Sequence, residues 1–223
     1  MILIPALELG PKEAKVDETV AAARGLRAKG ALFCHVVDVA AATGKGEHTA
    51  VLQGLVDAML PFQVAGGIRD VATAQKLLKL GADRVIAGTM FFEQPEEAKQ
   101  LVARFGPRVM AALDLRGGHV VVRGREKDSG LTLADGLRRV KECGVQAIVF
   151  TPLDALEQDA PPNEADLRAV VETGASVQLV ARVRTREQFT SLLALTEHGV
   201  SGLVLAQTRH EESFDLEQAF AMA

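Results

Sequence analysis

The chain has 223 residues, of which 48% are hydrophobic and 24% are charged, and its net charge at pH 7 is −4. This length and apolar content fit one α/β domain with a sizeable core. The acidic balance, together with the lack of basic residues interleaved with aromatic ones, argues against a nucleic-acid-binding surface.

The first residues are apolar, but they lack a basic leader, and Pro5 and Glu8 interrupt the run. No stretch approaches the roughly 18 uninterrupted apolar residues of a membrane-spanning helix. We therefore expect a cytoplasmic protein that does not cross a membrane. No group of His and Cys residues has the spacing of metal ligands, and no metal or other cofactor is predicted.

Short apolar runs alternate with amphipathic stretches along the whole chain. Predicted strands lie near residues 2–7, 31–38, 61–65, 83–87, 109–114, 146–151, 176–181 and 201–205. Predicted helices lie near residues 17–29, 47–59, 70–80, 94–105, 132–143, 163–173, 185–198 and 214–222. The strands are continuous runs of Val, Ile, Leu and Ala, which is typical of a parallel sheet covered by helices. Eight βα units without a polar linker favour a closed (βα)8 TIM barrel, with an open doubly wound sheet as the alternative.

One segment breaks this pattern. Gly117 and Gly118 lead into alternating residues that end at Gly124. A glycine turn followed by alternation is typical of a β-hairpin, so we predict a short hairpin in the loop after the fifth strand.

The two halves of the chain repeat one another. Residues 4–9 and 110–115 are each an apolar run that closes on a carboxylate, Glu8 in the first and Asp114 in the second. This repeat predicts two acids that face one cavity.

Further segments follow the same repeat. Gly66-Gly67-Ile68-Arg69 aligns with Ala181-Arg182-Val183-Arg184, and Val36-Val37-Asp38 aligns with Pro152-Leu153-Asp154. We expect a single barrel domain over residues 1–223, built from half-barrels of about residues 1–106 and 107–223.

In this order and spacing, the segments resemble the phosphoribosyl isomerase family of histidine biosynthesis (HisA-like barrels), and more distantly its sister cyclase subunit. The matching segments are residues 4–8, 35–38, 66–69, 87–89, 112–116, 129–130 and 150–151. The resemblance covers nearly the whole chain. It implies a (βα)8 barrel that catalyses an Amadori rearrangement, in which the ring of an aminoaldose with a phosphate at each end opens and is converted to an aminoketose.

The resemblance also implies catalytic residues. Glu8 and Asp114 take the acid positions on the first and fifth strands, and Thr151 lies beside them on the sixth. An aldose-to-ketose shift needs one group to protonate the ring oxygen and another to move a proton from C2, and two carboxylates can do both. The alternative is structural: the acids cap the barrel mouth through salt bridges with Arg69 or Arg116, and Thr151 is an ordinary strand residue.

Glycines at two strand ends suggest a phosphate site. Gly66, Gly67 and Gly88 let backbone N–H groups approach an anion, Thr89 adds a donor, and a helix begins just beyond each turn. Arg69 either assists the anion or pairs with neighbouring acids. The alternative is two tight βα turns without a ligand.

His35 lies at a strand end, and the resemblance implies a counterpart near the substrate; a buried core histidine fits the sequence equally well. The chain also departs from the family pattern. Glu8 stands where the family has Asp, and Arg125 stands where it has a mobile tryptophan. In the second half, Ala181-Arg182 replaces Gly-Gly and Ala206-Gln207 replaces Gly-Arg.

Arg182 cannot let the backbone approach an anion as glycine does, but its guanidinium can bind one directly. With Arg125, Arg184 and Arg209 it forms either a rebuilt anion site or a solvated rim of charges.

Three functions therefore stay open. The first is a sugar-phosphate isomerase of the histidine-pathway type. The second is a diverged barrel enzyme acting on another, monophosphorylated, substrate. The third is a non-catalytic homologue that binds a phosphorylated ligand. Each predicts a small phosphorylated sugar or nucleotide-like partner, and none predicts an oligomeric state.

Overall fold

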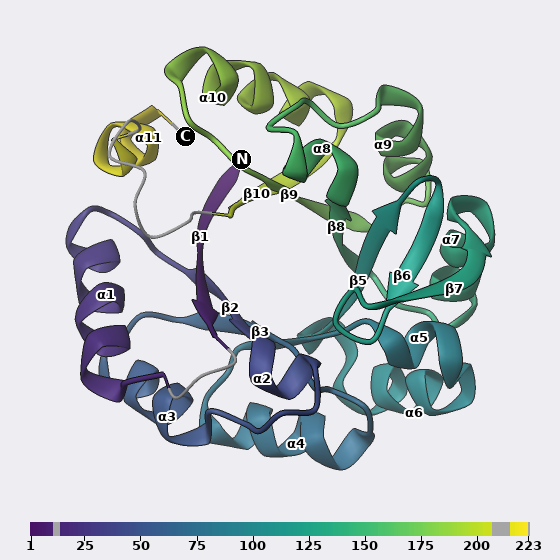
Figure 1. Ribbon diagram of the computed structural model, residues 1–223, viewed down its shortest axis with the longest axis horizontal. Coiled ribbons are helices and arrows are strands. Elements are labelled where there is room, and N and C mark those ends of the chain that lie inside the picture. Colours follow the sequence, from purple (N-terminus) through teal and green to yellow (C-terminus); the bar gives the residue numbers. More distant parts are fainter. Residues whose placement is uncertain (11–13, 207–214, 223) are drawn as a thin grey trace.

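Eight strands of the computed structural model, which describes residues 1–10, 14–206 and 215–222, close into a parallel barrel (Figure 1). In order around the ring they are β1 (Ile2–Leu9), β2 (Cys34–Asp38), β3 (Phe62–Ala65), β4 (Arg84–Ala87), β5 (Val109–Arg116), β8 (Ala147–Pro152), β9 (Ser176–Ala181) and β10 (Val200–Leu205). β4 pairs with β5, and β10 pairs with β1, so the ring is closed. The predicted (βα)8 barrel is confirmed.

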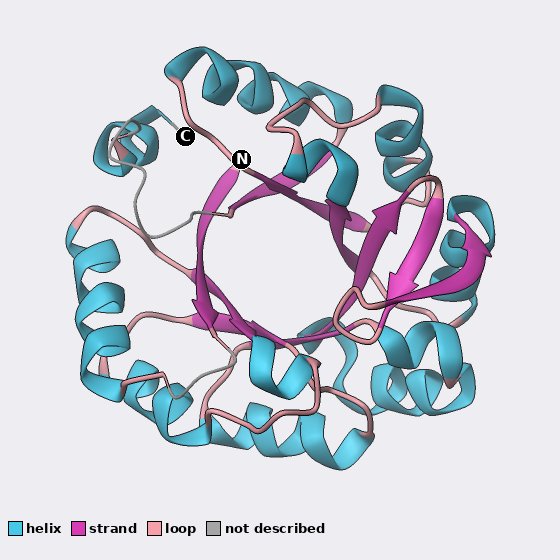
Figure 2. Cartoon of the chain, viewed as in Figure 1, coloured by secondary structure: helices cyan, strands magenta, loops and turns pink. Residues whose placement is uncertain are grey.

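The helices form an outer ring around these strands (Figure 2). Those that follow the predicted pattern are α1 (Val16–Ala28), α3 (Thr49–Asp57), α4 (Val71–Leu80), α6 (Pro95–Phe105), α7 (Leu133–Glu142), α9 (Glu164–Val171), α10 (Arg186–Leu193) and α11 (Leu216–Met222). The short elements that the pattern did not predict separately are α2 (Val39–Ala42), α5 (Thr89–Glu93), α8 (Leu153–Glu157) and the 3-10 turns η1 (Gly106–Arg108) and η2 (Ala194–His198). None of the helices in the described part of the chain could span a bilayer.

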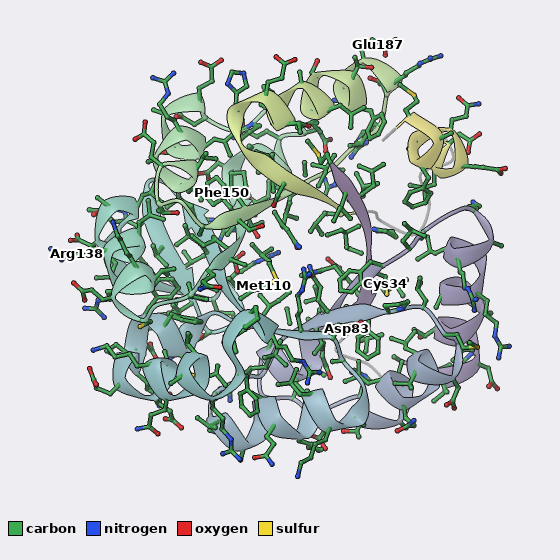
Figure 3. All side chains as sticks on the ribbon, turned by 180° about the vertical axis from the view of Figure 1, so that it is seen from behind. Cys34, Asp83, Met110, Arg138, Phe150 and Glu187 are labelled. Carbon is green, nitrogen blue, oxygen red and sulfur yellow. The ribbon has the colours of Figure 1, made fainter. Side chains whose placement is uncertain are left out.

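Side chains on each strand alternate between two cores. Met110 and Val149 belong to a small cluster inside the ring, whereas Phe150 belongs to the large cluster between the strands and the helices. Figure 3 labels a member of each, Met110 and Phe150. Because successive residues of a strand point to opposite faces, Asp114 points inward like Met110 and lies at the carboxyl end of the same strand.

The predicted hairpin after the fifth strand is confirmed and extends further than expected. It consists of β6 (His119–Val122), which pairs antiparallel with β5, and β7 (Lys127–Thr132). Arg123 donates its backbone N–H to Thr89 Oγ1 at 2.8 Å, and its guanidinium lies 3.0 Å from a Glu93 carboxylate oxygen. Lys127 also reaches Glu93, at 3.2 Å. These contacts fasten the hairpin to α5.

The turn after β3 packs tightly against the end of β2. Gly66 has φ of +106°, and a Cβ placed there would lie 2.2 Å from the carbonyl oxygen of Asp38. Asp38 is held in place because its carboxylate accepts the backbone N–H groups of Ala41 at 3.0 Å and His48 at 2.8 Å. Only glycine combines this backbone angle with this approach.

Replacing Gly66 with alanine should therefore destabilise the barrel by about 2–5 kcal/mol, because the new methyl group forces the β2 end and the β3 turn apart. Gly25 provides the control, since it lies within α1 and a Cβ added to it would meet nothing within 4 Å. Gly25→Ala should stabilise by about 0.5–1 kcal/mol. Urea unfolding curves measure both changes, and equal stability of Gly66→Ala and wild type would contradict this account.

Candidate active site

A cavity of about 350 Å³ opens where the barrel strands reach their carboxyl ends. It is lined by side chains from the strands, the βα turns and the β6–β7 hairpin. The predicted site residues that line it are Glu8, His35, Gly66, Gly67, Arg69, Gly88, Thr89, Asp114 and Thr151. One cavity thus brings together all the predicted site residues except Arg182.

The two acids enter this cavity from opposite sides. Glu8 is on β1 and Asp114 on β5, which stand four strands apart in a ring of eight. Thr151 is the register partner of Asp114 on the adjacent β8, and it is buried. The glutamate is exposed to the cavity mouth, and the aspartate side chain is 20% exposed. Two carboxylates and a hydroxyl therefore surround one solvent-connected space.

Asp114 forms an ion pair that the sequence did not predict. Arg125, in the turn between β6 and β7, places Nε 3.2 Å from Asp114 Oδ2 and Nη2 3.4 Å from Oδ1. Burial alone would lower the pKa of Arg125, but the carboxylates of Asp114, Glu8 and Glu157 outweigh it and raise the pKa. One guanidinium thus lies within the field of both predicted catalytic acids.

Arg69 and Arg116, the two arginines expected to cap the acids in a purely structural role, contact other groups. Arg116 pairs with Glu157, and Arg69 donates to the carbonyl oxygen of Ala42 at 3.1 Å. Neither arginine takes Asp114 as its ion-pair partner, so the proposed capping by Arg69 or Arg116 is wrong for this carboxylate. Asp114 is held by the hairpin instead.

His35 is buried and neutral. Its Nδ1 lies 3.0 Å from Nε2 of Gln63, on the neighbouring strand. Burial and, to a lesser extent, the charge of Arg125 lower the pKa of His35 to about 4, against the opposing effect of Asp114. His35 is thus a core residue that also lines the cavity, and its contact with a substrate stays a prediction.

The glycines of the predicted phosphate site are required by the backbone itself. Gly66 and Gly67 have φ of +106° and +70°, and Cβ atoms added to them would clash with Asp38 and Ala41. Thr89 Oγ1 accepts the hairpin N–H of Arg123, yet Thr89 still lines the cavity. The turns therefore pack closely at the cavity mouth, and phosphate binding there stays a prediction.

Arg182 has a different environment. Its Nη1 lies 3.2 Å from Oδ1 of Asp159, and Nε of Arg184 lies 2.9 Å from Oδ2 of the same carboxylate. A carboxylate of the chain itself thus lies between the two arginines. Arg209, which the sequence also assigns to this rim, and Gln207, which replaces the arginine of the Gly-Arg pair, lie outside the described residues.

Comparison with known proteins now bears on this site. The family model described as "Histidine biosynthesis protein" matches residues 10–215. The chain belongs to this histidine biosynthesis family. A relative from Paracoccus denitrificans is 32% identical over 235 residues, covering 98% of each chain. One from Pelobacter propionicus is 31% identical over 198 residues, covering 87% of this chain and 80% of its own.

A third relative of the family, from Deinococcus radiodurans, is 43% identical over 137 residues, which cover 60% of this chain and 58% of its own. All three relatives are named as isomerases of the same compound. The name describes a 1-(5-phosphoribosyl) imidazole-4-carboxamide with a (5-phosphoribosylamino)methylideneamino group at position 5.

Sequence reasoning missed two features of this family member. It considered Arg125 as a rim charge and not as the partner of Asp114, because nothing in the sequence shows where a hairpin turn points. It also missed Gln63, which contacts His35, and Gln178, which contacts Gln63. A signal was present, since each is a lone amide within an apolar strand of one half of the chain.

Replacing Arg125 with glutamine should raise the pKa of His35 from about 4 toward its ordinary value of 6.5, because a nearby positive charge disfavours the protonated ring. The pKa should stay below 6.5, since burial is unchanged. Arg116→Gln, which removes a charge paired with Glu157, serves as the control. An NMR titration of the ring protons follows both variants, and an unmoved His35 in Arg125→Gln would contradict this electrostatic link.

Proposed function

We propose that this protein catalyses an Amadori-type conversion of a phosphorylated aminoaldose to an aminoketose. The observation that carries the proposal is the pair of carboxylates, Glu8 and Asp114, which line one cavity from opposite strands with Thr151 beside the second. Such a reaction moves protons at two places on one sugar, which two acids on opposite sides can serve.

The proton transfers of this reaction define the roles of the two acids. One carboxyl group protonates the ring oxygen, so that the ring opens and C1 becomes an iminium. The other group, as carboxylate, removes the proton on C2 and gives an enaminol. This enaminol is protonated at C1 while its C2 hydroxyl gives its proton to the first group, now a carboxylate, so that C2 becomes the ketone. Both groups return to their starting protonation states at the end of the cycle, and no electron acceptor is consumed. Thr151, buried beside Asp114, supplies a hydroxyl that can bond the open-chain sugar.

The first half of the barrel is the proposed phosphate site. Gly67, Gly88 and Thr89 line the cavity at two adjacent strand ends, and Arg69 lines it from the same side. Turns of this kind expose backbone N–H groups, and a guanidinium adds a charge-assisted bond to an oxyanion. His35 lies on the neighbouring strand and completes the contacts we assign to the substrate.

The names of the relatives guide the choice of substrate. They describe a compound with two phosphoribosyl groups, one of which carries the amine. We infer that the same doubly phosphorylated aminoaldose is the substrate here, because the acids and the residues of the proposed first anion site match the family motifs in sequence and line one cavity.

A second candidate substrate rests on one specific observation. Arg182 and Arg184 follow β9, where the repeat places the counterpart of Gly66-Gly67, and both bind the Asp159 carboxylate. If Asp159 stays there during the reaction, it fills the second anion position, and the substrate carries one phosphate. If the substrate displaces it, the two arginines bind the second phosphate.

The central test is a spectrophotometric assay of the doubly phosphorylated aminoaldose, coupled to the enzyme that consumes its ketose product. Asp114→Asn should lower kcat by about 100-fold or more, because it removes an acid–base group while keeping its size. Asp57→Asn, which alters an exposed aspartate at the end of α3, should retain full activity. Full activity in a folded Asp114→Asn variant would remove the acid pair from the mechanism.

Absence of turnover from folded wild-type protein would favour a diverged substrate or a non-catalytic homologue. Binding then separates these possibilities, with ribose 5-phosphate and ribose 1,5-bisphosphate as probes. If neither probe binds, the phosphate site itself is disproved.

The position of Asp159 predicts how the two probes compare. If Asp159 fills the second anion position, Asp159→Asn should tighten binding of the bisphosphate by about tenfold, because it removes the carboxylate charge that competes with the second phosphate, and leave the monophosphate unchanged. Glu164→Gln, an exposed change on α9, is the control. Calorimetry measures both affinities. The single-phosphate candidate would be excluded if wild-type protein already bound the bisphosphate about tenfold more tightly than the monophosphate and Asp159→Asn added no further gain.

A further inference from the structure

A chain of three polar side chains crosses the interior of the barrel below the cavity. Gln63 Nε2 donates to Gln178 Oε1 at 2.6 Å, and the same nitrogen lies 3.0 Å from Nδ1 of His35. The exposed fractions are 0% for Gln63 and 5% for the other two. β3 and β9, which carry the glutamines, stand on opposite sides of the ring, so the bond between them spans it.

This chain lies in an otherwise apolar interior. The inner cluster consists of Ile4, Ile86, Met110, Val149, Leu156, Val180 and Val204. A buried amide costs free energy unless it is hydrogen-bonded, and apolar side chains would fill the same volume without that cost. The fold also makes room for the amides: a Cβ on Gly202 would lie 3.2 Å from Cγ of Gln178.

Strand register shows that the two glutamines hold the same place in each half. Glu8 pairs with Val37, two residues beyond His35, and His35 pairs with Gln63. In the other half, Asp114 pairs with Thr151, two residues beyond Val149, and Val149 pairs with Gln178. The second half thus has valine where the first has histidine. Gln63 therefore pairs with a histidine that can form a hydrogen bond, whereas Gln178 pairs with a valine that cannot.

The hydrogen-bond geometry favours one position for the imidazole proton. An amide nitrogen has only donors, so Nδ1 of His35 must accept, and a neutral ring then carries its proton on Nε2. In this orientation Gln63 leaves its carbonyl oxygen Oε1 without a partner. The flipped orientation would orphan an N–H instead, which proteins tolerate less well than an under-satisfied carbonyl. Among the described residues, no group bonds Nε2 of His35, which lines the cavity.

We propose that Gln63, oriented by Gln178, is a positioning residue that fixes His35 as a neutral imidazole with its N–H at Nε2, so that His35 donates a hydrogen bond to an oxygen of the bound sugar. The inference rests on the proposed function for the identity of the ligand, but the fixed tautomer is a property of the resting protein. A neutral donor suits a hydroxyl, ring or carbonyl oxygen, whereas a cation would attract the phosphate instead.

The charges around His35 are consistent with this state. Arg125 and Asp114 are the charged groups that act on the ring, with opposite signs, and burial dominates both. The pKa of about 4 keeps the ring neutral through the pH range of an ordinary assay.

The test is nitrogen NMR of the ligand-free protein, labelled at its histidine rings and assigned with His35→Gln. We expect the His35 signals of wild type to show an unprotonated Nδ1 and a protonated Nε2. Gln63→Met, which keeps the volume and removes the donor, should give a mixture of the two tautomers. Gln53→Met, an exposed change on α3, should leave the signals unchanged.

A proton on Nδ1 in wild type, or an unchanged tautomer in Gln63→Met, would overturn the proposal. If Gln63→Met does not fold, the wild-type spectrum still decides. In the isomerase assay Gln63→Met should lower kcat/KM by about tenfold, through loss of one oriented hydrogen bond. A wild type without turnover would count against the proposed function but leave the tautomer result standing.

Discussion

Closure of a parallel sheet is the constraint on which the rest of this structure depends. Once β1 pairs with β10 and β4 with β5, every second residue of each strand must point into the ring, and the carboxyl ends must meet at one mouth. Glu8 and Asp114 occupy inward positions at those ends. Their common cavity follows from register and parity, without any long-range contact between the two acids.

The hairpin and the βα turns then line the rest of the cavity mouth. Arg125 reaches Asp114 because the hairpin is fastened to α5 through Thr89 and Glu93. A substrate that uses Asp114 as a base must compete with this guanidinium, or bind it. The arginine is thus both the counter-ion of the acid in the resting site and a candidate contact for the ligand.

The second half of the barrel has a different balance of charge. Where the first half has Gly66-Gly67, the second has an arginine bound to Asp159, which itself adopts φ of +52°. A left-handed aspartate is uncommon, although its short polar side chain tolerates this region better than most. The two halves thus share an architecture and differ in the groups that follow β3 and β9.

Much of this arrangement could be predicted from the sequence, because strand parity and glycine spacing are local. The alternating apolar runs give the barrel, and the repeat of residues 4–9 in 110–115 gives the acid pair. Side-chain partners could not be predicted. Arg125 lies eleven residues from Asp114, and only the paths of β6 and the turn bring them together. The repeat also misaligned Asp38 with Asp154, whereas the register makes Asp38 equivalent to Pro152 when Glu8 and Asp114 are superposed.

Proton transfer at C2 of the sugar is the central claim, and isotope exchange in heavy water measures it most directly. Wild-type protein incubated with the doubly phosphorylated aminoaldose in D2O should form a ketose that carries solvent deuterium at C1, visible as loss of proton signal by NMR. Such incorporation is expected because the C2 proton taken by a protein group exchanges with solvent before C1 is protonated. Folded protein that leaves the aminoaldose chemically and isotopically unchanged would contradict the account.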